Sequence, residues 1–319
     1  MFCRAMPWLA VCGLTSGCVI ENWFDDPDDT VDDALWVEEH FTQQALPKVD
    51  VLFVVDNTGS MAEEHVFLAE GFSDFVSALD DASLSYQLGV IHTDMSDSEA
   101  GVLQGNPWIV SSSLDDPETA FAQAVDVGTD GASPEAGLAA MVTALREPLR
   151  SGANRGFRRE DASLQVVVVS DDDDGSEAWL GADPAGVAAA LLADEAASGL
   201  SAVFSAVVGD HPAGCVGSYG TAFAGERYLE LVELTGGVAA SICDADLASV
   251  YEALGSQAVQ YGSRFALQAA PVVDSLRVSL DGVKTEAWQY DPEGWAVVFD
   301  EPPAPNSFVE IRYQLEEEE

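Results

Sequence analysis

Three oxygen-bearing side chains stand at alternate positions shortly after residue 55. Residues 49–55 are an apolar, β-branched run, and Asp56, Thr58 and Ser60 follow it directly. Such a run predicts a buried strand, and in an open α/β sheet ligands bind beyond the carboxyl ends of the strands. Carboxylate and hydroxyl oxygens are hard donors that suit Mg²⁺, Mn²⁺ or Ca²⁺. The spacing therefore predicts a divalent cation site after this strand.

The same residues have a second interpretation that needs no metal. Ser60 and Glu63 form the Ser-x-x-Glu pattern of a capping box, which closes the first turn of a helix. Asp and Gly after a strand are also common turn residues. Two later segments favour the metal.

Both later segments carry oxygen donors of the same kind. Residues 127–131 read Val-Gly-Thr-Asp-Gly and contain Thr129, while Ser133, nearer the next predicted helix, is a rival donor. Residues 170–176 read Ser-Asp-Asp-Asp-Asp-Gly-Ser and follow a strand of four consecutive valines. Adjacent aspartates repel one another, so a cation or solvent must relieve their charge. An EF-hand loop is a poor match, because Gly181 stands where that loop needs its bidentate Glu.

The three segments resemble the metal-ion-dependent adhesion site (MIDAS) of von Willebrand factor type A (vWA) domains. The Asp-x-Ser/Thr-x-Ser motif of that family matches Asp56, Thr58 and Ser60, its threonine loop matches Thr129, and its acid after a buried strand matches Asp171. The resemblance implies that Asp171 meets the metal through water and that Mg²⁺ (or Mn²⁺ or Ca²⁺) is the ion. It also implies a protein partner that offers an acidic side chain to the ion.

Strands and helices are predicted to alternate through residues 48–262, the part that resembles a vWA domain. Apolar runs typical of strands cover 49–55, 84–93, 165–169, 202–208 and 238–242. Apolar residues at helical spacing occur over 62–79, 184–198, 221–234 and 246–261, and a further helix is predicted to start at Pro134. This order predicts an α/β fold with a doubly wound, mostly parallel sheet, as in vWA and Rossmann-like proteins. Over residues 263–315 the apolar period changes to two, which predicts a small C-terminal antiparallel β module.

The first residues have the layout of an export signal. Arg4 precedes a short apolar stretch over residues 5–11, and small residues precede Cys18. This layout predicts a signal peptide over residues 1–17. The small residues before Cys18 resemble a bacterial lipoprotein cleavage box, which implies lipid on Cys18; the alternative is a plain secretory signal cut near the same point. Because Val19 is not the Asp associated with inner-membrane retention, the resemblance implies anchoring to the outer membrane or cell surface.

Two acidic segments flank the predicted domains. Residues 18–47 are rich in Asp and weakly periodic, which predicts a charged, extended tether, and residues 316–319 are an acidic tail. Of the five cysteines, Cys215 and Cys243 remain once the predicted signal and lipidated cysteine are set aside. An even pair in an exported protein predicts a disulfide.

Charge limits the classes of partner. Fifty-six acids against 12 bases give a net charge of −44, which repels nucleic acid and anionic lipid, so contact with a membrane is expected only through the lipid anchor. The chain has no Gly-rich phosphate loop, and we expect no nucleotide. An exported metal-dependent hydrolase using His65 and His92 is an alternative, but no Gly-x-Ser-x-Gly or His-Glu-x-x-His motif supports it. A second alternative function is that of a structural envelope protein with a vestigial metal site. The motifs favour a non-enzymatic, metal-dependent adhesion module.

Overall fold

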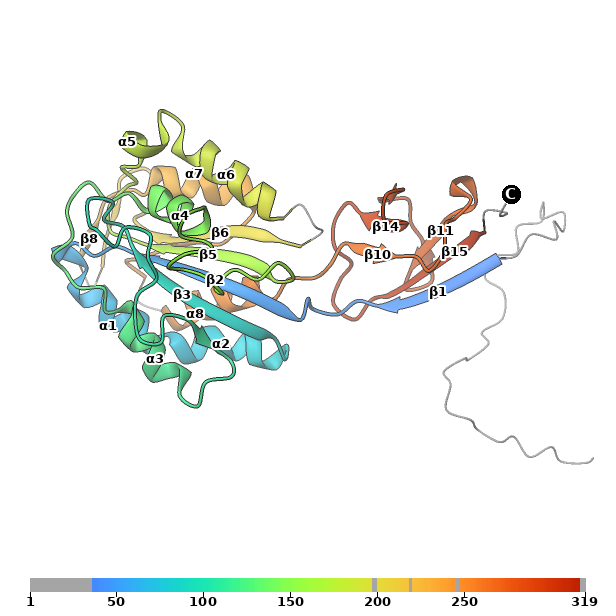
Figure 1. Cartoon of the computed structure of the whole chain (residues 1–319), viewed down its shortest axis with the longest axis horizontal. Helices are drawn as coiled ribbons and strands as arrows, with labels where there is room; N and C mark the ends of the chain where they lie inside the picture. Colours follow the sequence, from blue (N-terminus) through green and yellow to red (C-terminus); the bar gives the residue numbers. More distant parts are fainter. Residues whose placement is uncertain (1–35, 197–199, 218–219, 245–246, 316–319) are drawn as a thin grey trace, which may run out of the picture.

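A computed structural model describes residues 36–196, 200–217, 220–244 and 247–315, which form two units joined at a narrow waist (Figure 1). The predicted signal peptide, the lipidated Cys18 and the acidic tail over 316–319 lie outside these residues. No helix within the described ranges is long and apolar enough to cross a membrane.

The larger unit is built around a six-stranded sheet. Its strands, in spatial order, are β4 (Val110–Ser111), β3 (Ser85–His92), β2 (Lys48–Val55), β5 (Ser163–Val169), β6 (Ala202–Val208) and β9 (Ala239–Ser241). All neighbours are parallel except β4, which runs antiparallel to β3. Every residue of β5 is buried, because apolar side chains on both faces of this central strand pack against helices.

Helices cover both faces of this sheet. On one face lie α1 (Ala62–Glu70), α2 (Phe72–Asp81), α3 (Pro117–Val125) and α8 (Leu247–Ala258). On the other lie α4 (Gly137–Leu145), α6 (Pro184–Glu195) and α7 (Glu226–Thr235), with the short α5 (Glu177–Leu180) nearby. The single helix predicted over 62–79 is two helices, since the chain breaks at Gly71. A side chain at Gly71 would overlap the ring of Tyr251 on α8, so glycine lets these helices pack closely.

The smaller unit consists of two antiparallel sheets. One has the order β1 (Trp36–Thr42), β15 (Phe308–Gln314), β11 (Arg277–Leu280) and β12 (Val283–Lys284), and the other has the order β10 (Arg264–Ala266), β14 (Ala296–Phe299) and β13 (Trp288–Asp291). Alternate apolar side chains from both sheets form one core, which includes Phe265, Val297, Ile311 and Tyr313. Trp288 and Tyr290 pack against this core, so the period-two pattern marks a buried face.

The fold class predicted from the sequence is wrong. The central sheet is mixed, because β4 pairs antiparallel with β3, and three further sheets are antiparallel: the two of the smaller unit and the hairpin of β7 (Cys215–Val216) and β8 (Thr221–Ala222). Short strands of two residues carry too few side chains to show a period, which is why the sequence pattern missed them.

The smaller unit is also more than a C-terminal module. Residues 36–42, placed in the tether by the sequence analysis, form β1 and pair along their whole length with β15. Val37 and Phe41 face the core, while charged residues between them hide the alternation. The chain therefore crosses the waist twice, and the two connections meet where Ala45 pairs with Tyr261.

Candidate metal centre

The parallel register of β2 and β5 brings Asp56 and Ser170 together at the carboxyl edge of the sheet. Val55 pairs with Val169, and the next residue of each strand begins a loop. The Asp56 backbone N–H donates to the Val169 carbonyl at 3.0 Å, and the Ser170 hydroxyl donates to Asp56 Oδ2 at 2.7 Å. Asp56 is fully buried, so its carboxylate is held in a set position.

The three oxygen donors of the first loop, Asp56, Thr58 and Ser60, lie close together. The backbone N–H and the hydroxyl of Thr58 donate to Asp56 Oδ1 at 2.9 and 2.8 Å. The hydroxyl oxygens of Thr58 and Ser60 lie 3.3 Å apart. Adjacent ligand oxygens in an octahedral Mg²⁺ site with bonds of 2.0–2.1 Å are separated by about 3 Å. The spacing of Asp56, Thr58 and Ser60 therefore fits such an ion.

His65 supports this loop from α1. Its Nε2 lies 2.7 Å from the Asp56 backbone carbonyl, and the side chain is buried. The contact holds the main chain at the residue that supplies the carboxylate. This gives the histidine a positioning role in the loop.

Asp171 faces the first loop from the end of β5. It hydrogen-bonds with Ser60, while its Oδ1 is buried and has no hydrogen-bond partner within the described ranges. Burial raises the pKa of Asp171, and the negative charges of Asp56 and Asp172 raise it further, against the lowering effect of Ser60. An unpaired buried oxygen is costly, and a water molecule held by a cation would satisfy it.

The second predicted loop lies over the first. Gly131 N–H donates to the Asn57 carbonyl at 2.8 Å, and a Cβ on Gly59 would stand 3.6 Å from the Thr129 carbonyl oxygen. These contacts are made by the main chain. The side chains of Thr129 and Ser133 are both exposed, so both hydroxyls stay candidate donors.

The four aspartates at 171–174 have different surroundings: the first two lie at the site, and the last two lie at the starts of helices. Asp173 accepts from the backbone N–H of Arg227 at 3.0 Å, at the start of α7. Asp174 accepts from the backbone N–H of Leu138 at 3.0 Å, at the start of α4, and is buried. Both cap helix N-termini, where carboxylates are favourable. Asp172 remains beside the site, and burial together with the charges of Asp56 and Asp173 raises its pKa.

Sequence reasoning missed a further carboxyl group, Glu135, which precedes α4. It is only 3% exposed, and its carbonyl accepts from the Gly175 N–H at 2.6 Å, which joins it to the aspartate loop. Burial raises the pKa of Glu135 to about 7, and the charges of Asp56, Asp172 and Asp171 add to the effect. A Glu near a helix start is so common that no signal in the sequence marks it.

This edge of the sheet has the properties of a hard cation site. Among the described residues, Asp56, Asp171 and Asp172 form no ion pair with Lys or Arg. Asn57 Oδ1 is a second buried oxygen without a partner there. All of these donors are oxygens, which suits Mg²⁺, Mn²⁺ or Ca²⁺.

Comparisons with known proteins add little. No protein-family model matches the sequence, and no curated protein matches it. Similar solved structures include proximal thread matrix protein 1 from the mussel byssus, with 15% identity, 72% of this chain and 51% of that chain covered, and a TM-score of 0.41. Another is the pilus adhesin SpaC from Lactobacillus rhamnosus GG, with 14% identity, 89% and 42% covered, and a TM-score of 0.37. The chain thus spans about half the length of the solved proteins it matches.

Proposed function

We propose that this chain is a cell-envelope module that binds one Mg²⁺, Mn²⁺ or Ca²⁺ ion and engages the carboxylate of a protein partner through it. Asp56, Thr58 and Ser60 contact the ion, with Thr129 or Ser133 from the second loop and Asp171 through water. The observation that carries the proposal is the buried Oδ1 of Asp171, which lies next to the first loop and has no hydrogen-bond partner in the part of the chain that the structure describes. The role is binding, as in the MIDAS that these loops resemble.

The surface beside the ion suits a partner with apolar residues next to its acid. The Phe223 N–H donates to the Asp171 carbonyl at 2.8 Å, and the Phe223 side chain is 68% exposed. An aromatic ring there adds apolar contact to a charge-assisted contact at the ion.

Replacing Asp56 with alanine should abolish a single saturable metal site. The loss follows because the substitution removes the only carboxylate of the first loop and the acceptor of three hydrogen bonds. Titration calorimetry with Mg²⁺ or Mn²⁺ at about 0.15 M salt measures it, since diffuse attraction to exposed acids is largely screened there. Asp194→Ala, an exposed acid on α6, removes the same charge and should titrate like wild type. Equal titration of wild type and Asp56→Ala, with the fold intact by circular dichroism, would refute the site.

Binding of a protein partner through the ion is tested separately from metal binding. Protein captured from a cell-envelope extract in Mg²⁺ should be released by EDTA and should not be captured by Asp56→Ala. A captured partner should lose binding when its contacting Asp or Glu becomes Asn or Gln. If metal binds but EDTA changes nothing in the capture, the adhesion role fails while the metal site stands.

We also propose attachment to the outer membrane or cell surface through lipid on Cys18, which lies outside the described residues. Labelled palmitate should enter the wild-type protein in cells and not Cys18→Ser. Retention of label by Cys18→Ser, or a mature protein that still begins at Met1, would overturn this placement.

A further inference from the structure

A histidine and two glutamates meet on the outer face of the smaller unit, whereas the first site belongs to the sheet of the larger unit. His40 on β1 pairs directly with Glu310 on β15, and Glu38 stands two residues before His40. Directly opposed residues, and residues two apart on one strand, share a face of the sheet. The three side chains therefore lie together on the face that points away from the core.

Their ligand atoms are close enough to share an ion. His40 Nε2 lies 3.3 Å from Glu38 Oε1, and one ligand atom from each of the three residues lies within 4.8 Å of the others. Ligands at 2.0–2.1 Å around tetrahedral Zn²⁺ stand about 3.3–3.4 Å apart. Small side-chain rotations would close the remaining gap, and these exposed or half-buried side chains have the freedom to make them.

The surroundings orient the imidazole and hold the two carboxyl groups close to each other. The His40 ring stacks on Phe308, with ring centroids 5.2 Å apart. Burial raises the pKa of Glu310, and the nearby Glu38 raises it further, while His40 and Arg312 lower it. Arg312 is opposite Glu38 on the same face, where its guanidinium lies 4.6 Å from the centre of the Trp36 ring. The Glu38 and Glu310 side chains share a hydrogen bond, and a bound cation would take the place of the proton between them.

A neighbouring serine gives an independent indication. Ser279 on β11 pairs with Glu310 from the other side, so the row across the sheet reads His40, Glu310, Ser279. Ser279 is 1% exposed, and its hydroxyl has no hydrogen-bond partner within the described ranges. Buried hydroxyls are normally paired. A water bound to an ion beside Glu310 would supply the missing partner.

We propose that Glu38, His40 and Glu310 bind one divalent transition-metal ion, of which Zn²⁺ is the representative, with water completing the shell. The imidazole ligand distinguishes this site from the oxygen-only centre of the larger unit, because nitrogen donors favour Zn²⁺, Cu²⁺ or Ni²⁺ over Mg²⁺. Within the described residues β1 pairs only with β15. The ion would therefore fasten an edge strand from one end of the described chain to a strand from the other end.

Calorimetry with Zn²⁺ alone tests this site. The titration uses the whole protein at about 0.15 M salt with Mg²⁺ in excess, so that the first centre and the diffuse acidic surface are occupied or screened. Wild type should show one saturable Zn²⁺ site, and His40→Ala should weaken it at least tenfold. Glu310→Gln should weaken it as well, because it removes a charged ligand and keeps the shape.

His211 supplies the matched control. Its Nδ1 lies 3.3 Å from Glu226 Oε1, so it is also an exposed histidine–carboxylate pair. His211→Ala should bind Zn²⁺ like wild type, and His40→Ala should keep the Mg²⁺ titration of wild type. Zn²⁺ should also raise the unfolding midpoint of wild type and of His211→Ala, and not that of His40→Ala. Equal Zn²⁺ binding by wild type and His40→Ala would overturn the proposal, as would loss of binding in His211→Ala alone.

Discussion

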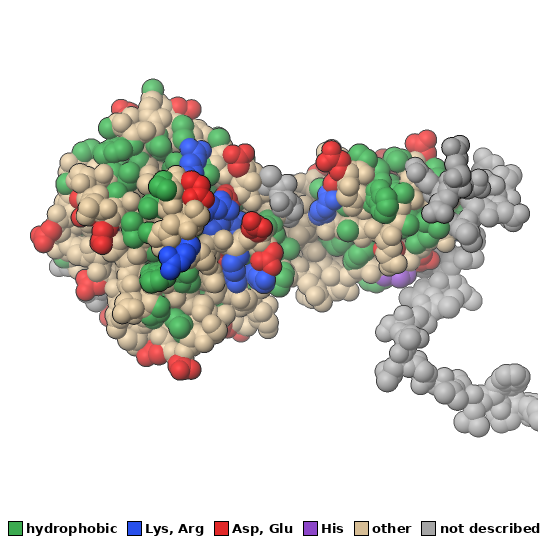
Figure 2. Space-filling model, in the orientation of Figure 1, with side chains coloured by type: hydrophobic (Ala, Val, Ile, Leu, Met, Phe, Trp, Pro, Cys, Tyr) green, Lys and Arg blue, Asp and Glu red, His purple; other side chains and the backbone are tan. Residues whose placement is uncertain are grey.

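Replacing Asp50 with alanine is expected to lower the free energy of unfolding by about 3–5 kcal/mol, the usual cost of removing one partner of a buried ion pair. Asp50 is fully buried in β2, between apolar neighbours. Arg159 Nε donates to Asp50 Oδ1 at 2.7 Å, and the Arg158 guanidinium donates to Oδ2 at 3.1 Å. Both arginines belong to a group of basic side chains on the larger unit near the waist, where Figure 2 shows Lys and Arg gathered among acids.

The large loss of stability is expected because Asp50→Ala leaves its arginine partners without the Asp50 carboxylate. The Arg158 side chain is only 3% exposed, so water cannot replace the lost carboxylate. Glu195 at 2.7 Å is then its one remaining carboxylate partner among the described residues, beside the carbonyls of Arg159 and Ala162. Asp50 also accepts from the Arg159 backbone N–H at 2.7 Å, which ties this loop to the sheet. Removal of Asp50 thus takes one carboxylate from the buried Arg158 and leaves the Arg159 backbone N–H without its acceptor.

Urea unfolding followed by circular dichroism measures the change. Asp50→Asn keeps the size of the side chain and should also be strongly destabilised, because it removes the charge. Asp161→Ala is the control: its carboxylate pairs with Lys48 on the surface, and its midpoint should stay within error of wild type. An Asp50→Ala midpoint equal to that of Asp161→Ala would show that the pair contributes nothing.

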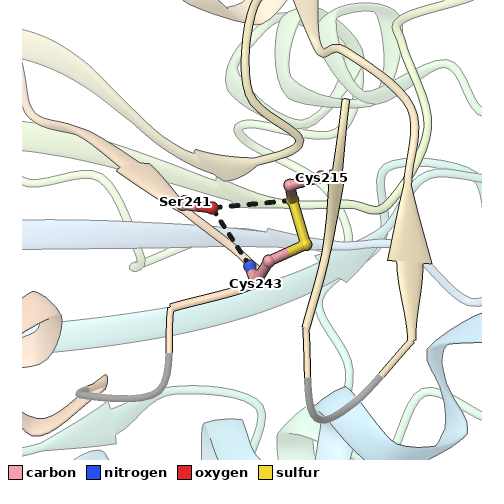
Figure 3. The surroundings of a disulfide bond; sticks show 3 residues. All are labelled: Cys215, Ser241 and Cys243. Atoms are coloured by element: carbon pink, nitrogen blue, oxygen red, sulfur yellow. Dashed lines mark hydrogen bonds between the residues drawn. A yellow bond between two sulfur atoms is a disulfide. The ribbon is translucent and has the colours of Figure 1, made fainter. Parts of the chain in front are cut away.

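Removing the disulfide is expected to lower the free energy of unfolding by roughly 3–4 kcal/mol in the chain-entropy model. The structure contains the Cys215–Cys243 bond that the sequence predicts, between residues 28 apart. The bond joins β7 to the segment after β9. Ser241, the last residue of β9, contacts Cys215 Sγ with its hydroxyl at 3.6 Å and accepts from the Cys243 N–H at 3.2 Å (Figure 3). Without the disulfide, the unfolded chain gains conformations that the folded chain does not.

The double variant Cys215→Ser/Cys243→Ser tests this value by chemical unfolding. Wild type in reducing agent should match the variant, which separates the loss of the bond from the effect of the new hydroxyls. Addition of the same reductant to the variant should change nothing. Two free thiols in non-reduced protein, detected by mass spectrometry, would show that the bond does not form.

Loss of the disulfide is also expected to affect metal binding. The hairpin ends next to Phe223, whose N–H donates to the Asp171 carbonyl. Loosening this segment gives Asp171 more freedom, so metal affinity should weaken in the double variant without being lost. The first loop does not depend on the hairpin, because its donors surround Asp56 through local bonds.

Much of the element order was readable from sequence. The strands at 49–55, 165–169 and 202–208 were predicted close to β2, β5 and β6, because continuous apolar, β-branched runs bounded by polar loops have few other solutions. The helix over 62–79 was predicted as one element, since the apolar spacing continues across Gly71. Only the packing of Tyr251 against that glycine reveals why the helix breaks there.

Some contacts of the site could be predicted from the sequence, and others depend on the fold. Asp56, Thr58 and Ser60 lie within five residues of one another, so their closeness was determined by the covalent chain and could be predicted. The contact of Ser170 with Asp56 joins residues 114 positions apart and depends on the register of two strands. Glu135 reaches the same edge from a third segment, and no local pattern distinguishes it from an ordinary residue at a helix start.

The sequence by itself determined the local features of this protein: the apolar strands, the oxygen donors that follow Val55, the excess of acid and the cysteine pair. Only the tertiary structure decided which aspartates of the run cap α4 and α7 and which face the site, and that β1 joins β15 instead of forming a tether. The physical reason is that a residue's type and spacing set what it can bond, whereas its partner is chosen by the packing of whole sheets and helices. That packing minimises buried unpaired groups over the entire chain, and a local sequence pattern does not carry this information.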